Sequence, residues 1–327
     1  MSNKTIVNYP KVSIITCVYN GEKYLSKLLE SVLNMEYPNI EHIIVNDGST
    51  DSTDTLIKDY IKIYESKENS SLHIKYLKQK NMGLGGATNT GLNNITGEFW
   101  TWINCDDWYE KYAFFEPIRM LMEKPKLDYV QMNGFYKGKK NNGDLIVNPS
   151  SKMNFNSGKK LYKQYCYNNS DFRYLLFICK TQSYKKICPT MHIYPSKYTQ
   201  DDQFIVQLFA LTKGEFCRKP TWNFLQRNDS FLHIGAEGHI NDMDNIVKGS
   251  VELLNVSPRV KNALYALFYE HNYVENLKHY ALIHKPLGML RYFFQKRTYR
   301  KKISIRFFNC FNHMTFLYFI YSLLFFL

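Results

Sequence analysis

The amino-acid sequence predicts an α/β fold with a mostly parallel central sheet and flanking helices. Two observations lead to this expectation. Short apolar runs alternate with stretches of helical periodicity along roughly the first hundred residues, as they do in βαβ units. The chain has 327 residues, of which 45% are hydrophobic and 22% are charged, and this composition is typical of a globular protein of one or two domains.

The first two strands and the helix between them are expected near the N-terminus. Lys11 to Tyr19 is an apolar, β-branched run typical of a buried strand, and Asn20-Gly21 interrupts it. A second strand is expected at Ile40 to Val45, after a break at Tyr37-Pro38-Asn39. Between them, apolar side chains recur at helical spacing, at Leu25, Leu28, Leu29, Val32 and Leu33.

The next elements continue this alternation. Ser52 or Thr53 is placed to cap a helix that reaches about Tyr64, and Leu72 to Leu77 predicts the third strand. A glycine cluster at residues 83–86 precedes a short helix. Glu98 to Ile103 predicts a fourth strand, which runs directly into polar residues 104–107.

The remaining pattern is less regular. Lys137 to Asn142 is typical of a loop or hairpin, and an apolar helical stretch covers Phe204 to Leu211. Ser257-Pro258 predicts a helix start, because proline is favoured at the first helical position.

Acidic residues follow two predicted strands at their carboxyl ends, where parallel sheets bind ligands. Asp47 follows the second strand, and Asp106 and Asp107 follow the fourth. Adjacent carboxylates repel each other without a cation, and Mg²⁺ or Mn²⁺ takes such oxygen ligands and bridges diphosphates. The alternative is that the pair forms a solvated turn and that Asp47 is a turn or cap residue.

A second acidic pair and a histidine are further candidates. Asp201 and Asp202 precede the apolar stretch at Phe204, where either could cap a helix or act as a general base that deprotonates a hydroxyl. His233 could ligate a metal or contact phosphate, although a single histidine often does neither.

The order of these motifs resembles that of the family 2 glycosyltransferases. The resemblance rests on four stretches, which are Val12–Gly21, Ile43–Asp51, Asn81–Leu92 and Gly97–Asp107. It implies a GT-A fold, an inverting mechanism, Mn²⁺ or Mg²⁺ as cofactor, and a nucleotide-diphosphate sugar donor, with UDP expected. It also implies that residues 1–110 bind the nucleotide-sugar and that residues 111–255 bind the acceptor.

The resemblance assigns donor-binding roles residue by residue. Cys17 and Tyr19 would line the nucleoside pocket, with Tyr19 stacked on the base. Asp47 would accept the N–H of the pyrimidine. Asn81 and Asn104 lie at further donor-binding positions of the motifs.

The resemblance also assigns the metal site and the base. Asp106 matches the metal-binding Asp, and Asp107 and His233 are further candidate ligands. Asp201 matches the catalytic Asp, with Gln200 in place of the family's Glu, whereas a register one residue later makes Asp202 the base.

Two further positions depart from the family pattern. Asn104 replaces the first Asp of the metal motif, and Thr88 stands where many relatives have Arg. These departures keep open the alternative of a catalytically degenerate, transferase-like scaffold. The other alternative is a sugar nucleotidyltransferase, although Val18 to Lys23 does not resemble the phosphate loop of that class.

The C-terminal part, residues 256–327, is expected to be a helical, membrane-associating extension. Met314 to Leu327 has no charge, and no acidic residue follows Glu275. We expect this basic, aromatic tail to lie on an anionic membrane, whereas packing on the catalytic domain or on a second subunit of a homo-oligomer is the alternative. Nucleic acid is not an expected partner, because it would leave the apolar end in water. The tail's positive charges are Lys278, Lys285, Arg291, Lys296, Arg297, Arg300, Lys301, Lys302 and Arg306.

Cysteine usage bears on the compartment. The seven cysteines are scattered without a C-x-x-C pair, which predicts reduced thiols, and the polar first ten residues show no secretory signal core. We therefore expect a cytoplasmic enzyme, peripheral on the inner face of the cell membrane. That location suits a glycan or lipid-linked glycan acceptor in cell-surface polysaccharide synthesis.

Overall fold

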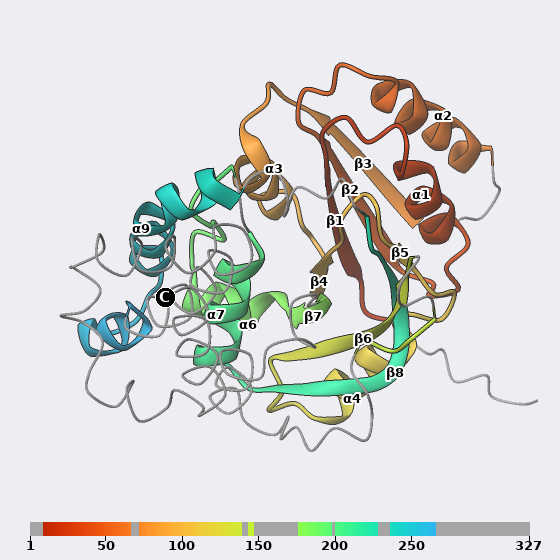
Figure 1. Ribbon diagram of the computed structural model, residues 1–327. Coiled ribbons are helices and arrows are strands. Elements are labelled where there is room, and N and C mark those ends of the chain that lie inside the picture. The colour runs from red at the N-terminus through yellow and green to blue at the C-terminus, as the bar shows by residue number, and fades with distance from the viewer. Residues whose placement is uncertain are drawn as a thin grey trace, which may run out of the picture. The chain divides into compact units, whose positions relative to one another are not determined.

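The structure is a computed structural model that describes residues 9–66, 72–138, 143–146, 176–197, 200–227 and 236–265. In these residues eight strands form one mixed, mostly parallel sheet in the order β3-β2-β1-β4-β7-β6-β8-β5 (Figure 1). By its contacts the chain divides into residues 1–255 and 256–327. Every labelled element belongs to the first of these units.

The first half of the sheet is parallel, as the sequence predicts. β1 (Val12–Val18) lies between β2 (Ile40–Asn46) and β4 (Phe99–Trp102), and β3 (Leu72–Lys78) pairs with the far side of β2. The connections are α1 (Leu25–Leu33), α2 (Thr53–Glu65) and α3 (Gly83–Leu92). The carboxyl ends of these strands therefore share one edge of the sheet.

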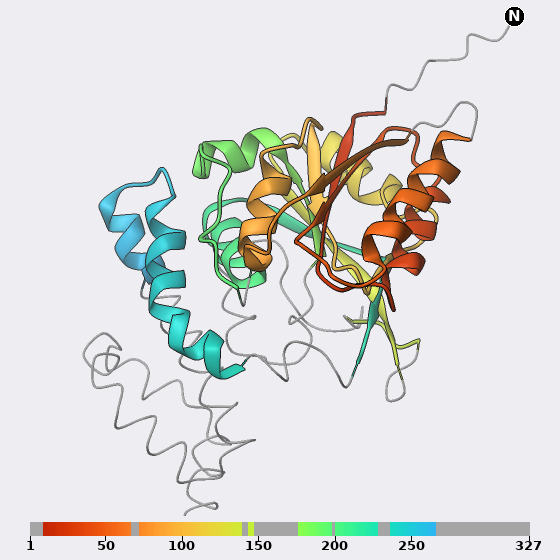
Figure 2. The same cartoon turned by 90° about the horizontal axis from the view of Figure 1, so that it is seen from above.

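Helices cover both faces of this parallel part (Figure 2). Successive side chains of a strand point to opposite faces. Ile14 and Ile44 belong to the core cluster that contains the buried residues of α1 and α2. Ile43 and Val45 instead pack with Ala87 of α3. Burial on both faces explains why β1 and β4 are nearly continuous apolar runs, whereas the edge strand β3 has exposed positions along its length.

The second half of the sheet is mixed. β7 is antiparallel to β4 and β6, and β8 is parallel to β6 and antiparallel to β5. Through β5, the end of β8 lies next to the loop that follows β4. The bounds are β5 (Trp108–Tyr109), α4 (Phe115–Glu123), β6 (Tyr129–Lys137), β7 (Leu176–Lys180), α6 (Thr181–Ile187), α7 (Asp201–Leu211), β8 (Gly214–Leu225) and α9 (Ala236–Glu252).

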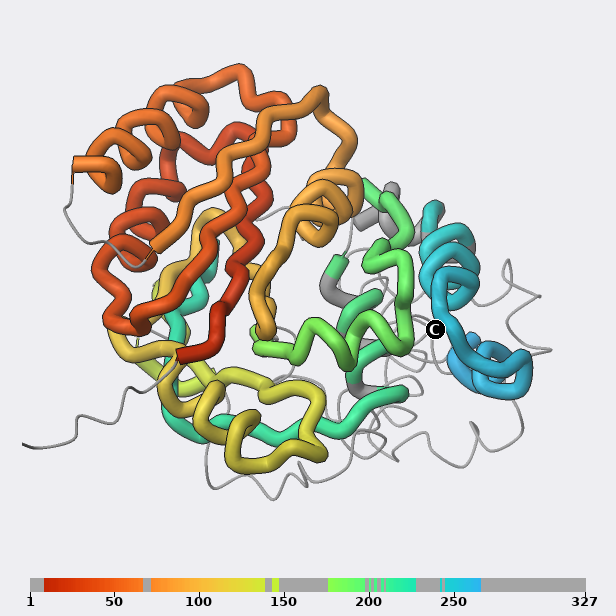
Figure 3. Tube along the Cα trace, turned by 180° about the vertical axis from the view of Figure 1, so that it is seen from behind, coloured from red at the N-terminus to blue at the C-terminus, as the bar shows by residue number. Residues whose placement is uncertain are grey.

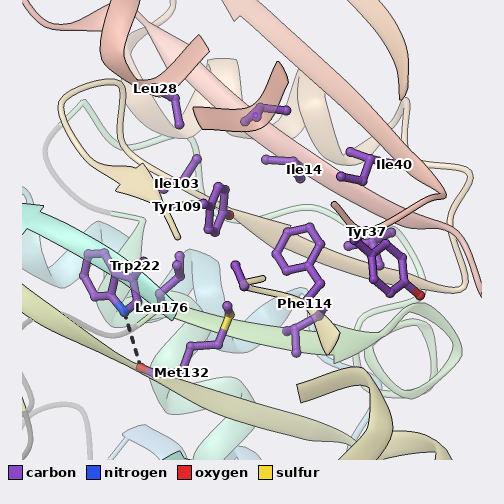
Figure 4. Close-up of a cluster of buried hydrophobic side chains, with 14 of the residues drawn as sticks. Ile14, Leu28, Tyr37, Ile40, Ile103, Tyr109, Phe114, Met132, Leu176 and Trp222 are labelled. Carbon is purple, nitrogen blue, oxygen red and sulfur yellow. Dashed lines mark hydrogen bonds between the residues drawn. The ribbon is translucent and has the colours of Figure 1, made fainter. Parts of the chain in front are cut away.

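One aromatic core joins the two halves (Figure 4). The Phe114 ring meets Tyr37 and Tyr109 edge to face, with centroid distances of 5.9 and 5.1 Å. Trp222 of β8 donates its indole N–H to the carbonyl of Met132 in β6 at 3.4 Å. These residues belong to the same buried cluster as Ile14 of β1, so the two halves are built on a shared core.

Two local predictions are confirmed. The chain after β6 turns back on it, because Phe135 forms an antiparallel bridge with Leu145, which is the expected hairpin. Residues 139–142 of that turn lie outside the described part. In the second unit, residues 258–265 form a helix that begins at Pro258.

The membrane prediction concerns residues that the structure does not describe. Among the described residues, no helix has the length and apolar character needed to cross a membrane. The basic stretch and Met314 to Leu327 both lie beyond residue 265, outside the described part.

Candidate active site

The candidate site lies at the carboxyl ends of the parallel strands. A small cavity there, of about 10 Å³, is lined by Cys17, Thr88, Asn104 and Gln200 together with apolar side chains. These residues come from β1, from α3, from the loop after β4 and from the residue that precedes α7. The fold thus brings the predicted donor residues Cys17 and Asn104 together, beside the start of α7.

Asp47 is buried under this edge, with 3% of its surface exposed. Its Oδ1 accepts hydrogen bonds from Gln79 Nε2 at 2.7 Å and from the N–H of Met82 at 2.9 Å. Its own N–H donates to the carbonyl of Val18 at 2.9 Å. Asp47 therefore ties together the ends of β1, β2 and β3, and its expected contact with a pyrimidine stays a prediction.

The loops after β1 and β2 interlock around Asn20, which has a positive φ of 51°. The N–H of Asn20 donates to Ser49 Oγ, and the N–H of Thr50 donates to Asn20 Oδ1. Next to this turn Tyr19 is 51% exposed, so its ring is accessible to a ligand. Asn81 is also exposed, and its Oδ1 accepts the N–H of Gly83 at 3.1 Å.

The two positions that lack the family's Arg and Glu are in direct contact. Thr88 Oγ1 lies 2.6 Å from Gln200 Oε1, and both residues are buried. A buried charge is costly unless it is paired, and the contact between hydroxyl and amide leaves this spot neutral and hydrogen-bonded. Cys17 Sγ lies 3.7 Å from the same hydroxyl. Burial raises the pKa of the Cys17 thiol to about 12, against the hydrogen bond from Thr88, so the thiol is protonated at neutral pH.

Helix α3 also docks on the chain that leads to α7 (Figure 3). The N–H of Gly85 donates to the carbonyl of Ser196 at 2.8 Å, and the Asn89 side chain pairs with both backbone groups of Ile193. A Cβ on Gly85 would lie 2.7 Å from the Ser196 nitrogen, so only glycine permits this approach. The donor side of the site is thereby fixed to the segment that precedes Asp201.

The acidic pair after β4 divides into two different environments. Asp107 is 2% exposed; its Oδ1 accepts the N–H of Leu225 at 2.9 Å, and its Oδ2 lies 3.3 Å from Asn104 Nδ2. Asp106 is paired with Arg227, whose Nε lies 2.7 Å from its Oδ2. Asp107 thus holds the end of β8 against this loop, whereas the carboxylate of Asp106 forms an ion pair with the guanidinium of Arg227.

Arg227 is the site residue that sequence reasoning missed. Its guanidinium lies 4.4 Å from the centre of the Tyr24 ring, which is a cation–π distance. Burial raises the pKa of the neighbouring Cys105 thiol to about 12; the Asp106 carboxylate adds to this effect and the Arg227 charge opposes it. The sequence signal for Arg227 is a single arginine just beyond a strand end, which by itself does not distinguish a site residue from a surface one.

Among the described residues, the carboxylate of Asp106 is the candidate ligand for a divalent cation, and no complete set of protein ligands surrounds it. Among them, no three His, Cys, Asp or Glu side chains are grouped as ligands of an ion. Mg²⁺ bound with a diphosphate commonly uses one or two carboxylates and takes its other oxygens from phosphate and water. Asp106 therefore fits a cation that arrives with a diphosphate, and Asp107, with both oxygens engaged, serves the fold.

The remaining predicted residues are only partly described. Asp201 and Asp202 are the first two residues of α7, but their side chains lie outside the described part of the structure. His233 lies outside it altogether. The roles of these three residues as base and metal ligand stay predictions.

Comparison with known families and proteins gives one consistent picture. The family model described as "Glycosyl transferase family 2" matches residues 13–195. Glycosyltransferase GlyA of Streptococcus pneumoniae is 28% identical over 247 residues, which are 76% of this chain and 30% of that protein. An uncharacterized glycosyltransferase of Rickettsia typhi is 36% identical over 126 residues, covering 38% of this chain and 36% of its own. The chain thus spans about a third of the length of these relatives.

Two solved structures share the fold. S. aureus TarS 1–349 in complex with UDP-GlcNAc has a TM-score of 0.59 at 18% identity, over 84% of this chain and 76% of that one. Mannosyltransferase PcManGT of Pyrobaculum calidifontis, in complex with GDP-Man and Mn²⁺, has a TM-score of 0.50 at 15% identity, over 90% of this chain and 83% of that one.

The two aspartates should respond differently to removal. We expect Asp107→Ala to lower the free energy of unfolding by about 1–3 kcal/mol, because the buried carboxylate is lost and the part-buried N–H of Leu225 loses its acceptor. The matched variant Asp106→Ala should cost less, because the guanidinium that it leaves behind is 21% exposed and keeps the Tyr24 ring as a neighbour. Urea unfolding followed by tryptophan fluorescence measures both. Equal losses in the two variants would contradict the division of roles.

Proposed function

The chain belongs to glycosyl transferase family 2 and has the GT-A fold, and we propose that it is an inverting, metal-dependent hexosyltransferase that uses a UDP-linked donor. The acceptor in this proposal is a hydroxyl of a glycan or lipid-linked glycan in cell-surface polysaccharide synthesis. The observation that carries it is the gathering of Cys17, Asn104 and the start of α7 at one sheet edge. The complexes of the structural neighbours with UDP-GlcNAc and with GDP-Man support a nucleotide-sugar donor.

Nucleotide binding would use the loops after β1, β2 and β3. The exposed ring of Tyr19 offers a face on which a base can stack, and Cys17 lines the cavity below as a neutral thiol. Asp47 would accept the pyrimidine N–H while its Oδ1 keeps the loops in place. Exposed Asn81 and cavity-lining Asn104 are polar groups suited to ribose or diphosphate.

The leaving group needs neutralising charge. A Mg²⁺ or Mn²⁺ ion, when bound, would supply a Lewis acid for the departing diphosphate. We assign its protein carboxylate to Asp106, with His233 as a candidate further ligand. Asp107 holds the motif in shape through Leu225 and Asn104.

The acceptor needs a base at the opposite end of the site. Asp201, or Asp202 in the alternative register, would remove the proton of the acceptor hydroxyl, and that oxygen would attack the anomeric carbon on the face opposite the diphosphate. A single displacement inverts the configuration and needs no covalent nucleophile. The Gln200–Thr88 hydrogen bond would fix the start of α7 against the donor half.

A donor screen tests the function. We expect the purified chain, with Mn²⁺ and one of the common nucleotide-sugars, to release nucleoside diphosphate, and excess EDTA to stop the release. Asp106→Asn should reduce turnover about 10²-fold or more, because a group that stabilises developing charge is lost. Full activity of that variant in EDTA would overturn the metal assignment. No release from any donor, in a folded protein, would favour the scaffold alternative.

The catalytic base is identified by paired single variants. Asp201→Asn should bind donor with unchanged affinity but transfer sugar about 10²–10⁴-fold more slowly, because donor binding and proton removal are separate demands. Asp202→Asn is the matched control and should stay close to wild type in rate. The reverse result would move the base to Asp202, and normal rates for both variants would place it elsewhere.

We also propose that the basic, apolar C-terminal tail holds the enzyme on the cytoplasmic face of an anionic membrane. The full chain should co-sediment with vesicles containing phosphatidylserine at low salt and be released at high salt, because screening weakens the attraction. A chain that ends at Lys285 should stay in the supernatant. If neither chain sediments, the tail packs on protein instead.

A further inference from the structure

We propose that Arg227 is a displaceable counter-ion of Asp106, so that a divalent cation and a nucleoside diphosphate bind to this site cooperatively. The inference rests on the proposed function and adds to it the residue that couples the two ligands. It starts from the ion pair between Arg227 Nε and Asp106 Oδ2, which is 2.7 Å long.

The ion pair is sheltered and its arginine is held from two sides. The side chains of Arg227 and Asp106 are 21% and 13% exposed. Two residues before Arg227, the N–H of Leu225 is fixed by Asp107, and the Tyr24 ring lies against the guanidinium. The backbone at Leu225 is thus anchored, while the guanidinium lies over the face of the Tyr24 ring.

A cation on its own therefore competes with Arg227. Arginine keeps its charge at every physiological pH, so it cannot vacate the carboxylate by losing a proton. A divalent ion bound to the same carboxylate would lie within a few ångström of the guanidinium, where like charges repel strongly in a partly buried setting. Mn²⁺ alone should therefore bind weakly.

A diphosphate reverses this balance. It brings negative charge beside Asp106, and a planar guanidinium binds phosphate oxygens in a bidentate manner. Arg227 can then move from Asp106 to the diphosphate while the cation takes the carboxylate, so each charge keeps a partner. Coupling of this kind is reciprocal: nucleotide strengthens metal binding by the same factor as metal strengthens nucleotide binding.

The test measures binding to the full chain without any turnover. Mn²⁺ affinity is determined by electron paramagnetic resonance with and without UDP, after calibration for the free Mn²⁺–UDP complex, and UDP affinity is determined by calorimetry in EDTA. For the wild type we expect UDP to strengthen Mn²⁺ binding about 5- to 150-fold, the usual range of coupling between two sites.

The variants separate the counter-ion role from a structural one. Arg227→Met should bind Mn²⁺ alone about tenfold more tightly than wild type and bind UDP in EDTA more weakly, since one charge pair of this kind accounts for roughly a tenfold change. Its coupling between Mn²⁺ and UDP should be about tenfold smaller than in the wild type, and the remainder comes from the contact of the cation with the diphosphate. Arg227→Lys keeps the charge and should retain weak binding of Mn²⁺ alone. A purely structural role would weaken both ligands together, and melting temperatures show whether each variant is folded.

Several outcomes would overturn the proposal. Unchanged or weaker Mn²⁺ binding by Arg227→Met shows that the arginine does not compete for the carboxylate. Absence of Mn²⁺ binding in both proteins, with and without UDP, shows that there is no cation site for it to guard. If Mn²⁺ binding behaves as expected but no nucleotide binds, the proposed function fails, whereas the competition between Arg227 and the cation stands.

Discussion

The ligand-binding edge of the sheet depends on one buried carboxylate, that of Asp47. Parallel strands deliver their loops to one edge of the sheet, but nothing in strand pairing fixes the loops themselves. Asp47 does so, because it accepts hydrogen bonds from Gln79 and Met82 and donates its N–H to Val18. A buried polar group is tolerated only with such partners, so the fold and the ligand-binding edge depend on the same hydrogen bonds.

The parallel half of the fold could be predicted because its signals are local. Each strand from β1 to β4 is a short segment rich in apolar and β-branched or aromatic residues, and each helix carries its own periodicity or breaker. The second half could not be predicted in the same way. β5 has two residues, and β7 and β8 are identified by partners far along the chain, such as Cys179 opposite Tyr129 and Trp222 opposite Tyr109. Such pairings leave little trace in a short window of sequence.

The contrast between local signals and long-range contacts also applies to the site residues. Asp106 and Asp107 are adjacent and look equivalent, but a strand end 118 residues later buries one of them and leaves the other to an arginine. In the sequence, Thr88 and Gln200 look like two separate departures from the family pattern. In the structure they form one neutral hydrogen-bonded pair, although 112 residues separate them along the chain. Motifs thus identified the positions, whereas the division of labour among them comes from contacts that only the folded chain makes.

Helix α3 carries a consequence for how the chain is made. Its sequence, GLGGATNTGL, contains four glycines, and glycine is the poorest helix former apart from proline. The helix is therefore stabilised by packing against the rest of the fold and not by its own sequence. Its partner Ile193 lies 104 residues further along the chain. At about 5–20 residues per second, a ribosome needs roughly 5–20 s to supply that partner. During this interval α3 can pack on Ile43 and Val45 but lacks its hydrogen bonds to Ile193, so we expect this apolar face to be weakly covered and accessible to a chaperone on the nascent chain.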